Sequence, residues 1–386
     1  MLPLFYVISH YSNLPFRAWE QRKFIEIINR LSKTSNSSIL PKVEYEDIIA
    51  EEGRLNKDIS NKFDSRKGIL FQPKNILYGK LRPYLKNWLY PDFKGVAVGD
   101  FWVFEAIEAT PRFIYNLIQS DSYQKVANDT AGTKMPRSDW TKVSNSSFFI
   151  PKESSEQKRI GTFFKQLDDT IALHQRKLDT LKQMKKGLLQ QMFPKSEEDV
   201  PKIRFADFDE EWYQRKLGEE FEKINERNDG SFGKTHWISV AKMYFVEPNK
   251  VLSNNIDTRT YVMRKGDIAF EGHSNTDFKF GRFVANDIGP GIVSELFPVY
   301  RHKTNYDNNY WKNAIQLEHI MAPIYSKSIT SSGNSSNKLD SKHFLNQKIY
   351  IADFEEQEKI GSIFKQLDNT IILYQNKLNK FDILKK

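Results

Sequence analysis

The chain has 386 residues, of which 39% are hydrophobic and 13% aromatic, so a disordered polypeptide is excluded and two domains with apolar cores fit its length. It contains no cysteine, which excludes disulfides and thiolate metal sites and fits a reducing cytoplasm. The formal net charge of +9 favours a polyanionic partner, of which nucleic acid is the obvious example.

The first 150 residues have the pattern of a mixed α+β domain. Residues 1–16 carry no basic segment and polar residues interrupt their apolar run, so we expect neither a signal peptide nor a membrane span there. A helical run is expected from Trp19 to Leu31. Further strands and helices are expected, in chain order, at residues 68–71, 96–98, 101–104, 111–120 and 121–128.

Residues 156–192 have the heptad spacing of a coiled-coil helix. Apolar side chains recur at alternating intervals of four and three from Ile160 to Met192, which keeps them in one stripe on one side of a helix. His174 falls on this seam and is interpreted as a polar mark of register. The alternative is an amphipathic helix that packs only on its own domain, although core helices rarely keep a strict heptad for so long.

The segment after this helix begins with a linker at residues 194–201, rich in proline and acidic residues, and continues as a second mixed α+β domain. Its strands and its helix are expected at residues 237–240, 260–263, 267–270, 291–293 and 309–320.

The chain contains an internal duplication. Residues 356–382 repeat residues 156–182 without a gap, and 15 of the 27 aligned positions are identical. The sequence Trp-x-Gln-Arg-Lys at Trp19 returns at Trp212, where it is again expected to lead into a helix. Between these landmarks the two halves differ almost completely, which indicates one scaffold that carries two different binding domains.

We therefore expect an α+β fold in which two mixed α/β domains are separated by a long antiparallel two-helix coiled coil, a dumbbell with an approximate two-fold axis. In a parallel pair the second domain would have to bridge the whole helix, about 55 Å at about 1.5 Å per residue. The expected boundaries are residues 1–151, 152–195, 196–351 and 352–386. The seam consists of Ile160, Phe164, Leu167, Ile171, Leu178, Ile360, Phe364, Leu367, Ile371 and Leu378.

No catalytic constellation is found in the sequence. Gly233-Lys234-Thr235 resembles the end of a P-loop, but Asn228 stands where that motif needs glycine. The seven histidines lack metal-ligand spacing, and no signature of a nuclease, a methyltransferase or a dinucleotide-binding loop is present. We expect no catalysis, no metal and no cofactor in this chain.

Four polar loops favour a binding function. They lie at residues 78–87, 129–137, 271–282 and 330–338, and they offer lysine and arginine for phosphates or guanine, with asparagine for adenine. For any single residue an ordinary solvated surface loop is about equally plausible, but four such loops on duplicated domains favour binding. The DNA-binding candidates are Lys80, Arg82, Lys86, Lys134, Arg137, Asn275, Lys279, Arg282, Asn334 and Lys338.

The chain resembles the specificity (S) subunit of type I restriction–modification systems. The resemblance rests on the duplicated Glu-Gln-Lys-Arg-Ile-Gly helix and on Trp-x-Gln-Arg-Lys at the start of both halves. It also rests on the sequences at residues 79–85, 132–137 and 266–272, and together these features extend over nearly the whole chain. The first half departs from the second because it has no counterpart of residues 203–208, and the second helix has no counterpart of residues 187–194.

The resemblance implies two target-recognition domains that each read one half of a bipartite double-stranded DNA site. The helices would set the spacing and dock two methyltransferase (M) subunits, and restriction (R) subunits would join through the complex. S-adenosylmethionine, ATP and Mg²⁺ would be bound by these partners. The implied location is the bacterial or archaeal cytoplasm, at the nucleoid, with no membrane partner. Two other classes stay open, a nuclease that acts alone and a coiled-coil scaffold protein.

Overall fold

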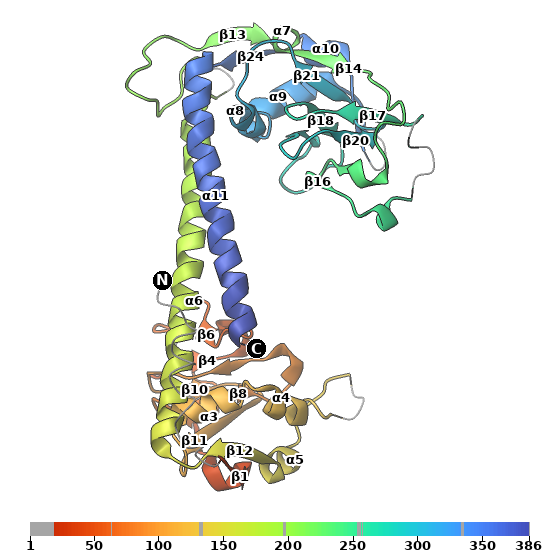
Figure 1. Cartoon of the computed structure of the whole chain (residues 1–386). Coiled ribbons are helices and arrows are strands. Elements are labelled where there is room, and N and C mark those ends of the chain that lie inside the picture. Colours follow the sequence, from red (N-terminus) through yellow and green to blue (C-terminus); the bar gives the residue numbers. More distant parts are fainter. Residues whose placement is uncertain are drawn as a thin grey trace. The chain divides into compact units, whose positions relative to one another are not determined.

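The computed structural model describes residues 19–62, 64–130, 134–195, 198–252, 256, 258–332 and 336–385 (Figure 1). The chain divides into two compact units, and each is a mixture of helices and strands. Unit 1 comprises residues 1–173 and 379–386, and unit 2 comprises residues 174–378. The expected α+β class is confirmed. Among the described residues no helix combines the length and the apolar character needed to cross a membrane.

Unit 1 contains two four-stranded sheets, with strand orders β2-β11-β8-β9 and β3-β7-β10-β4, and the antiparallel pairs β1–β12 and β5–β6. Its strands are β1 (Trp19–Lys23), β2 (Ile28–Leu31), β3 (Thr34–Ser35), β4 (Lys42–Val43), β5 (Ile48–Ile49), β6 (Arg54–Leu55), β7 (Gly68–Phe71), β8 (Ile76–Gly79), β9 (Trp88–Leu89), β10 (Gly95–Ala97), β11 (Phe101–Ala106) and β12 (Ser147–Pro151). Its short helices are α2 (Phe24–Ile27), α3 (Pro111–Leu117), α4 (Asp121–Ala127) and α5 (Trp140–Asn145).

Unit 2 repeats the main features of this frame. The sheet β14-β21-β18-β19 corresponds to β2-β11-β8-β9, and the pair β13–β24 corresponds to β1–β12. Its strands are β13 (Tyr213–Lys216), β14 (Phe221–Ile224), β15 (Ile238–Ser239), β16 (Tyr244–Phe245), β17 (Thr260–Met263), β18 (Ile268–Glu271), β19 (Arg282–Ala285), β20 (Gly291–Ser294), β21 (Val299–His302), β22 (Ile329–Ser332), β23 (Asn337–Leu339) and β24 (Lys348–Ile351). Its short helices are α7 (Leu217–Glu220), α8 (Asn308–Ala314), α9 (Glu318–Ser328) and α10 (Ser341–Leu345).

The helical run expected from Trp19 to Leu31 is wrong. This stretch is strand β1, one helical turn and strand β2, and the same succession follows Trp212 as β13, α7 and β14. The buried residues Phe24 and Ile27 do share one helical turn, but the segments on either side form backbone hydrogen bonds with β12 and β11. Tertiary pairing therefore overrides the local pattern. The single helix expected around residues 309–320 is also wrong, because α8 and α9 are separate helices.

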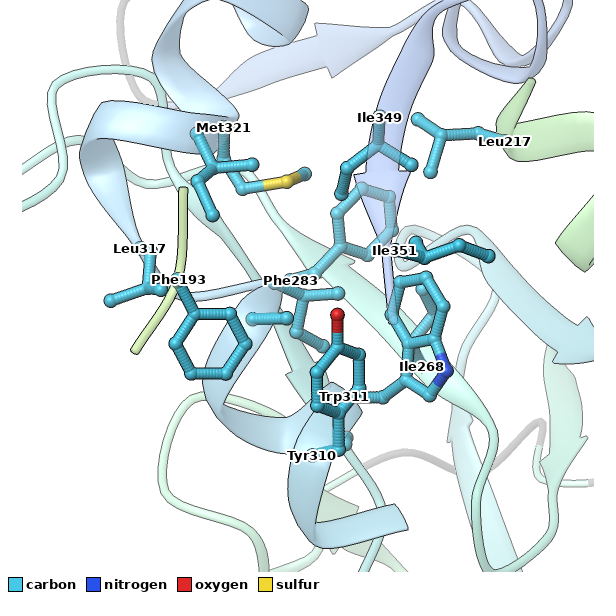
Figure 2. Close-up of a cluster of buried hydrophobic side chains, with 14 of the residues drawn as sticks. Phe193, Leu217, Ile268, Phe283, Tyr310, Trp311, Leu317, Met321, Ile349 and Ile351 are labelled. Atoms are coloured by element: carbon cyan, nitrogen blue, oxygen red, sulfur yellow. The ribbon is translucent and has the colours of Figure 1, made fainter. Parts of the chain in front are cut away.

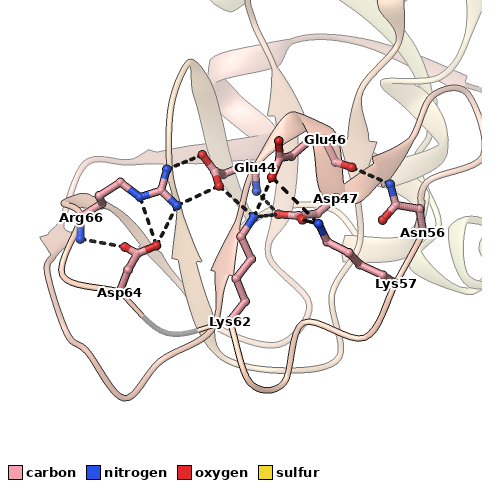
Figure 3. A network of polar contacts seen from close by, with 8 residues as sticks. All are labelled: Glu44, Glu46, Asp47, Asn56, Lys57, Lys62, Asp64 and Arg66. Atoms are coloured by element: carbon pink, nitrogen blue, oxygen red, sulfur yellow. Dashed lines mark hydrogen bonds and ion pairs between the residues drawn. The ribbon is translucent and has the colours of Figure 1, made fainter.

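Apolar side chains fill the interior of both units. Figure 2 shows the larger core of unit 2, where Trp311 and Phe283 are fully buried among aliphatic residues that include Ile268 and Ile351. In unit 1 an ion network joins acidic side chains at residues 44–47 and 64 to Lys57, Lys62 and Arg66 (Figure 3). At its centre lies the buried carboxylate of Asp47, whose Oδ2 is 2.7 Å from Lys62 Nζ. Burial alone would raise the pKa of Asp47, but the hydrogen bond from Lys62 and its further partners lower it below the ordinary value.

Two long helices carry the duplicated segment, α6 (Ser154–Gln191) and α11 (Phe354–Lys385). In unit 2, Lys185 Nζ lies 2.5 Å from Asp368 Oδ1, and the rings of His174 and Tyr374 meet edge to face with centroids 5.4 Å apart. Higher residue numbers on α6 therefore meet lower numbers on α11, so the two helices run in opposite directions there. Unit 1 contains the equivalent ion pair, between Lys385 Nζ and Asp168 Oδ1 at 2.8 Å.

The predicted seam residues are buried or half-buried. Leu178, Ile360, Phe364 and Leu378 are buried. The remaining seam positions are half-buried, namely Ile160, Phe164, Leu167, Ile171, Leu367 and Ile371.

The same hydrogen bond connects the start of each domain to the start of its long helix. Trp19 Nε1 donates to Glu156 Oε1 at 3.1 Å in unit 1, and Trp212 Nε1 donates to Glu356 Oε2 at 3.0 Å in unit 2. These are the two landmarks that the sequence repeats, the tryptophan of Trp-x-Gln-Arg-Lys and the glutamate of Glu-Gln-x-x-Ile-Gly. The two halves therefore share this contact as well as the sequence.

The glutamine that follows this glutamate makes a second repeated contact. Gln157 Oε1 accepts from the backbone N–H of Thr110 at 2.8 Å, and its Nε2 donates to the carbonyl of Pro151 at 2.9 Å. Gln357 makes the same pair of bonds in unit 2, to Asp307 N at 3.4 Å and to the Ala352 carbonyl at 2.9 Å. Thr110 and Asp307 are the N-cap residues of α3 and α8. Each buried amide thus attaches the long helix to a helix of its own domain.

The two anchors differ in one respect. Glu356 is fully buried and also forms a bidentate ion pair with Arg204. Arg204 Nε donates to Oε1 at 2.8 Å, and Nη2 donates to Oε2 at 2.9 Å. Arg204 belongs to residues 203–208, for which the first half of the sequence has no counterpart. Glu156 is only half-buried. The anchor of unit 2 therefore contains a desolvated ion pair that requires both partners.

We predict that Arg204→Ala destabilises unit 2 by about 3–5 kcal/mol, because it leaves the buried Glu356 carboxylate without its cation. The matched control is Arg22→Ala in unit 1. Arg22 pairs with the more exposed Glu26 and Glu20, so this substitution should cost much less stability than Arg204→Ala. Urea unfolding gives the free energies, and amide hydrogen exchange in β13 and β24 assigns the loss to unit 2. Equal losses for the two variants would contradict the difference between the anchors.

Candidate nucleic-acid interface

Two of the predicted loops in unit 1 are joined by backbone hydrogen bonds. Strand β8 ends at Gly79, and the chain then passes through Lys80 and Arg82. The N–H of Arg82 donates to the Pro136 carbonyl at 2.7 Å, and the N–H of Ser138 donates to the Lys80 carbonyl at 2.9 Å. This pairing brings Lys80 and Arg82 of the first loop beside the second loop, residues 134–138.

Asp100 holds two of these cations in place. Its carboxylate accepts a hydrogen bond from Arg137 Nη2 at 2.9 Å and lies 3.6 Å from Lys80 Nζ. The bond from Arg137 lowers the pKa of Asp100 below its ordinary value, so the carboxylate is ionised at neutral pH. Asp100 thereby fixes the direction of both cations and reduces the net positive charge of the loops by one.

The other DNA-binding candidates in unit 1 differ in whether they have an ion-pair partner. Lys86 Nζ lies 3.1 Å from Glu51 Oε1. Arg82 and Lys134 are exposed and have no ion-pair partner among the residues that the structure describes. Both side chains are available to contact phosphate groups.

In unit 2 the corresponding loops are joined in a similar way. The chain leaves β18 at Glu271, and the carbonyl of Gly272 accepts the N–H of Asn337 in β23 at 2.9 Å. Lys338, the next residue, is exposed. Asn334 lies outside the described residues.

Three candidates in unit 2 make contacts inside their own domain. Asn275 Oδ1 accepts the backbone N–H groups of Asp277 and Phe278, at 2.9 and 3.0 Å, and so shapes its own turn. The guanidinium of Arg282 lies 4.7 Å from the centre of the Phe278 ring and donates to the Ala241 carbonyl at 2.6 Å. Lys279 lies over the ring of Phe280 at 5.5 Å. Of these three, Asn275 and Lys279 are exposed, whereas Arg282 is half-buried.

Sequence analysis did not select His273, which the structure places in the same loop. Glu271 is buried, and its Oε1 accepts the His273 backbone N–H at 3.0 Å and contacts His273 Nδ1. A carboxylate only accepts, so Nδ1 carries the hydrogen and Nε2 is free to face a ligand. The sequence signal was present, because Glu-Gly-His directly follows a strand, but the pairing of residues two apart depends on the turn.

The described part of the chain contains no group of three or more histidine or acidic side chains that could hold a metal ion. Its loops combine cations, amides and one oriented imidazole. Such groups can recognise a polyanion with hydrogen-bonding edges, and nucleic acid is the ligand of this kind.

Residues 18–183 match the family described as type I restriction modification DNA specificity domain. A search of curated protein sequences found no match. A crystal structure of the type I restriction–modification system S subunit from M. genitalium has 13% identity and a TM-score of 0.60, with coverage of 97% of this chain and 96% of that chain.

A second solved structure comes from work on complex assembly and conformational transition of the type I R-M system. It has 16% identity and a TM-score of 0.54, with coverage of 97% of both chains. At these identities the likeness shows a shared fold, and it extends over both units.

The family match includes the loops of unit 1 and the first anchor, and unit 2 repeats that frame with loops of its own. Residues 18–183 therefore match a DNA specificity domain of type I restriction–modification systems, and the fold of both units is shared with solved structures from such systems.

Proposed function

We propose that each unit reads one half of a bipartite double-stranded DNA site. The observation that carries this proposal is the repeated joining of two loops: one that follows β8 or β18, and one that precedes α5 or α10. The chain presents its candidate cations on these joined loops, on a frame that is built twice. Two different sets of loops on one frame are suited to reading two different sequences.

The proposed domains are residues 1–151 and 196–351, and the proposed helical segments are residues 152–195 and 352–386. The antiparallel helices act as a spacer in a dumbbell with an approximate two-fold axis. They also dock two methyltransferase subunits, through which restriction subunits join the complex. S-adenosylmethionine, ATP and Mg²⁺ bind to these partners, and the assembly acts on the nucleoid in the cytoplasm of a bacterial or archaeal cell.

In unit 1 the side chains that contact bases are Arg82, Arg137 and Lys80, and Lys86 and Lys134 contact the flanking phosphates. In unit 2 they are Lys338 and the turn that contains Asn275, Lys279 and Arg282, together with Asn334. Arginine is the best guanine reader because its two donors match the O6 and N7 acceptors of that base. The fixed geometry of Arg137 on Asp100 supports a base contact, whereas the exposed Arg82 is suited to either role.

Charge reversal in one unit should affect only the half-site that this unit recognises. We predict that Arg137→Glu weakens the base preference at one half-site by about 1–3 kcal/mol and leaves the other half-site intact. Lys338→Glu should weaken the base preference at the other half-site and leave the first one intact. Selection of bound duplexes from a random pool by the purified chain gives both preferences in one experiment. If either variant loses preference equally at both half-sites, the division of labour between the units is wrong.

We predict that Asp100→Asn tightens binding to any duplex and weakens discrimination at the first half-site, because Lys80 and Arg137 are released from their carboxylate. Fluorescence anisotropy across a salt series should show a slope of log affinity against log salt that is steeper by about one. Asp64→Asn is the matched control, because it removes the same charge from the network of Figure 3 and should leave discrimination unchanged. An unchanged slope and unchanged discrimination in Asp100→Asn would contradict the site.

The spacer is tested by a longer pair of helices. One heptad inserted after Gln175 in α6 and one after Gln375 in α11 keep the seam in phase and lengthen the pair by about 10 Å. We predict that the DNA motif keeps both half-sites while its unspecified gap grows by up to about three base pairs, at about 3.4 Å each. Circular dichroism confirms that the variant is helical. A folded variant that binds with the original gap would show that the helices do not set the spacing.

A further inference from the structure

Three large apolar side chains are exposed on the joined loops of unit 1. Tyr84 is 55% exposed, Leu85 is 41% exposed and Met135 is 49% exposed. Tyr84 and Leu85 are neighbours at the tip of the first loop, and Met135 precedes Pro136, whose carbonyl accepts the N–H of Arg82. Single exposed apolar residues are ordinary on protein surfaces, but three on two joined loops form a patch.

The tip that carries Tyr84 and Leu85 is a fixed turn. It is a 3-10 turn, Pro83–Leu85, between two residues in the left-handed region, Arg82 at φ 49° and Lys86 at φ 54°. The Leu85 N–H donates to the Arg82 carbonyl at 2.8 Å, and the Lys86 carbonyl accepts the Glu51 N–H at 3.0 Å. Left-handed backbone at two non-glycine residues is strained, and it persists only where the surroundings hold it.

Cationic residues flank the patch on both loops. Lys80, Arg82 and Lys86 flank the tip on its own loop, and Lys134 and Arg137 flank Met135 on the other. Among the described residues, the carboxylates paired with these cations are Asp100 and Glu51. An apolar centre with a positive rim complements stacked bases between two phosphate backbones, whereas a protein partner would have to supply an acidic rim.

The loop at residues 271–282 of unit 2 does not present its aromatic side chains in this way. Phe278 lies beneath the guanidinium of Arg282, and Phe280 lies against Tyr325 with ring centroids 6.5 Å apart. Both phenylalanines are half-buried. The exposed tip is therefore a property of unit 1 and not of the repeated frame.

We propose that Tyr84, Leu85 and Met135 form an apolar wedge that enters the first half-site between base pairs and partly unstacks one step. This inference rests on the proposed reading of DNA by unit 1, and it adds how the unit contacts the base pairs. The flanking lysines and arginines hold the phosphates on both sides of the opened step. Because pyrimidine–purine steps unstack most easily, the wedge gives unit 1 a preference for such a step without a hydrogen bond to its bases.

The test uses the full-length chain and a duplex that carries both half-sites, chosen by selection from a random pool. The probe is 2-aminopurine, an adenine analogue whose fluorescence rises when it unstacks, placed at each position of the first half-site in turn. The variants are Tyr84→Ala with Leu85→Ala, and Tyr84→Phe alone. Ile39→Ala is the matched control, because Ile39 is 80% exposed in the same unit and lies in neither loop.

The wild-type chain and the Ile39 control should raise the fluorescence at one step. The double alanine variant should lose this signal and bind about tenfold more weakly, with an unchanged salt slope, whereas Tyr84→Phe should keep both the signal and the affinity. An unchanged signal in the double variant overturns the proposal. So does unchanged DNA affinity combined with lost binding of methyltransferase subunits, which would make the patch a protein contact.

The proposed function fails separately from the wedge. If Arg137→Glu and Arg82→Glu both leave binding at the first half-site unchanged, unit 1 does not read DNA with these loops. If they weaken it while the wedge variant behaves as the wild type, the reading stands and the wedge alone is wrong.

Discussion

The structure depends on one hydrogen-bonded anchor that is built twice. A tryptophan at the start of each domain donates to the first glutamate of the repeated helical segment, and the next glutamine binds the N-cap backbone of a domain helix. These bonds connect the long helix to three parts of its domain, namely its first strand, its last strand and one helix. Gly361 permits this approach, because a Cβ there would collide with Asp307. The anchor gives the repeated tryptophan, glutamate and glutamine the same contacts in both halves.

The anchor leaves the binding loops free to differ. In both units a loop after the strand β8 or β18 is joined by backbone bonds to a second loop, and backbone bonds place few demands on side chains. Unit 1 uses this freedom for cations held by Asp100 and for an exposed apolar tip. Unit 2 uses it for a histidine oriented by Glu271 and for aromatic rings covered by cations. One frame thus supports two chemically different surfaces.

The sequence was most informative where a pattern repeats over many residues. The long helices, the duplication and the α+β class could be predicted because heptad spacing and a gapless repeat are properties of the chain itself. The strand at Trp19 could not, because its conformation is set by pairing with residues 147–151, far away in sequence. Likewise the loops could be found from their cations, but not the role of Asp100, the Glu271–His273 pair or the exposure of Tyr84. Each of these depends on which loops the fold brings together.

We propose that the duplicated frame carries two DNA-binding domains that each recognise a sequence of their own. Mapping of DNA methylation in a host that expresses this chain with its methyltransferase subunits tests it most directly. We expect a bipartite motif with two different half-sites, separated by a gap of constant length and unspecified sequence. A continuous motif, or a palindrome with two identical half-sites, would contradict it.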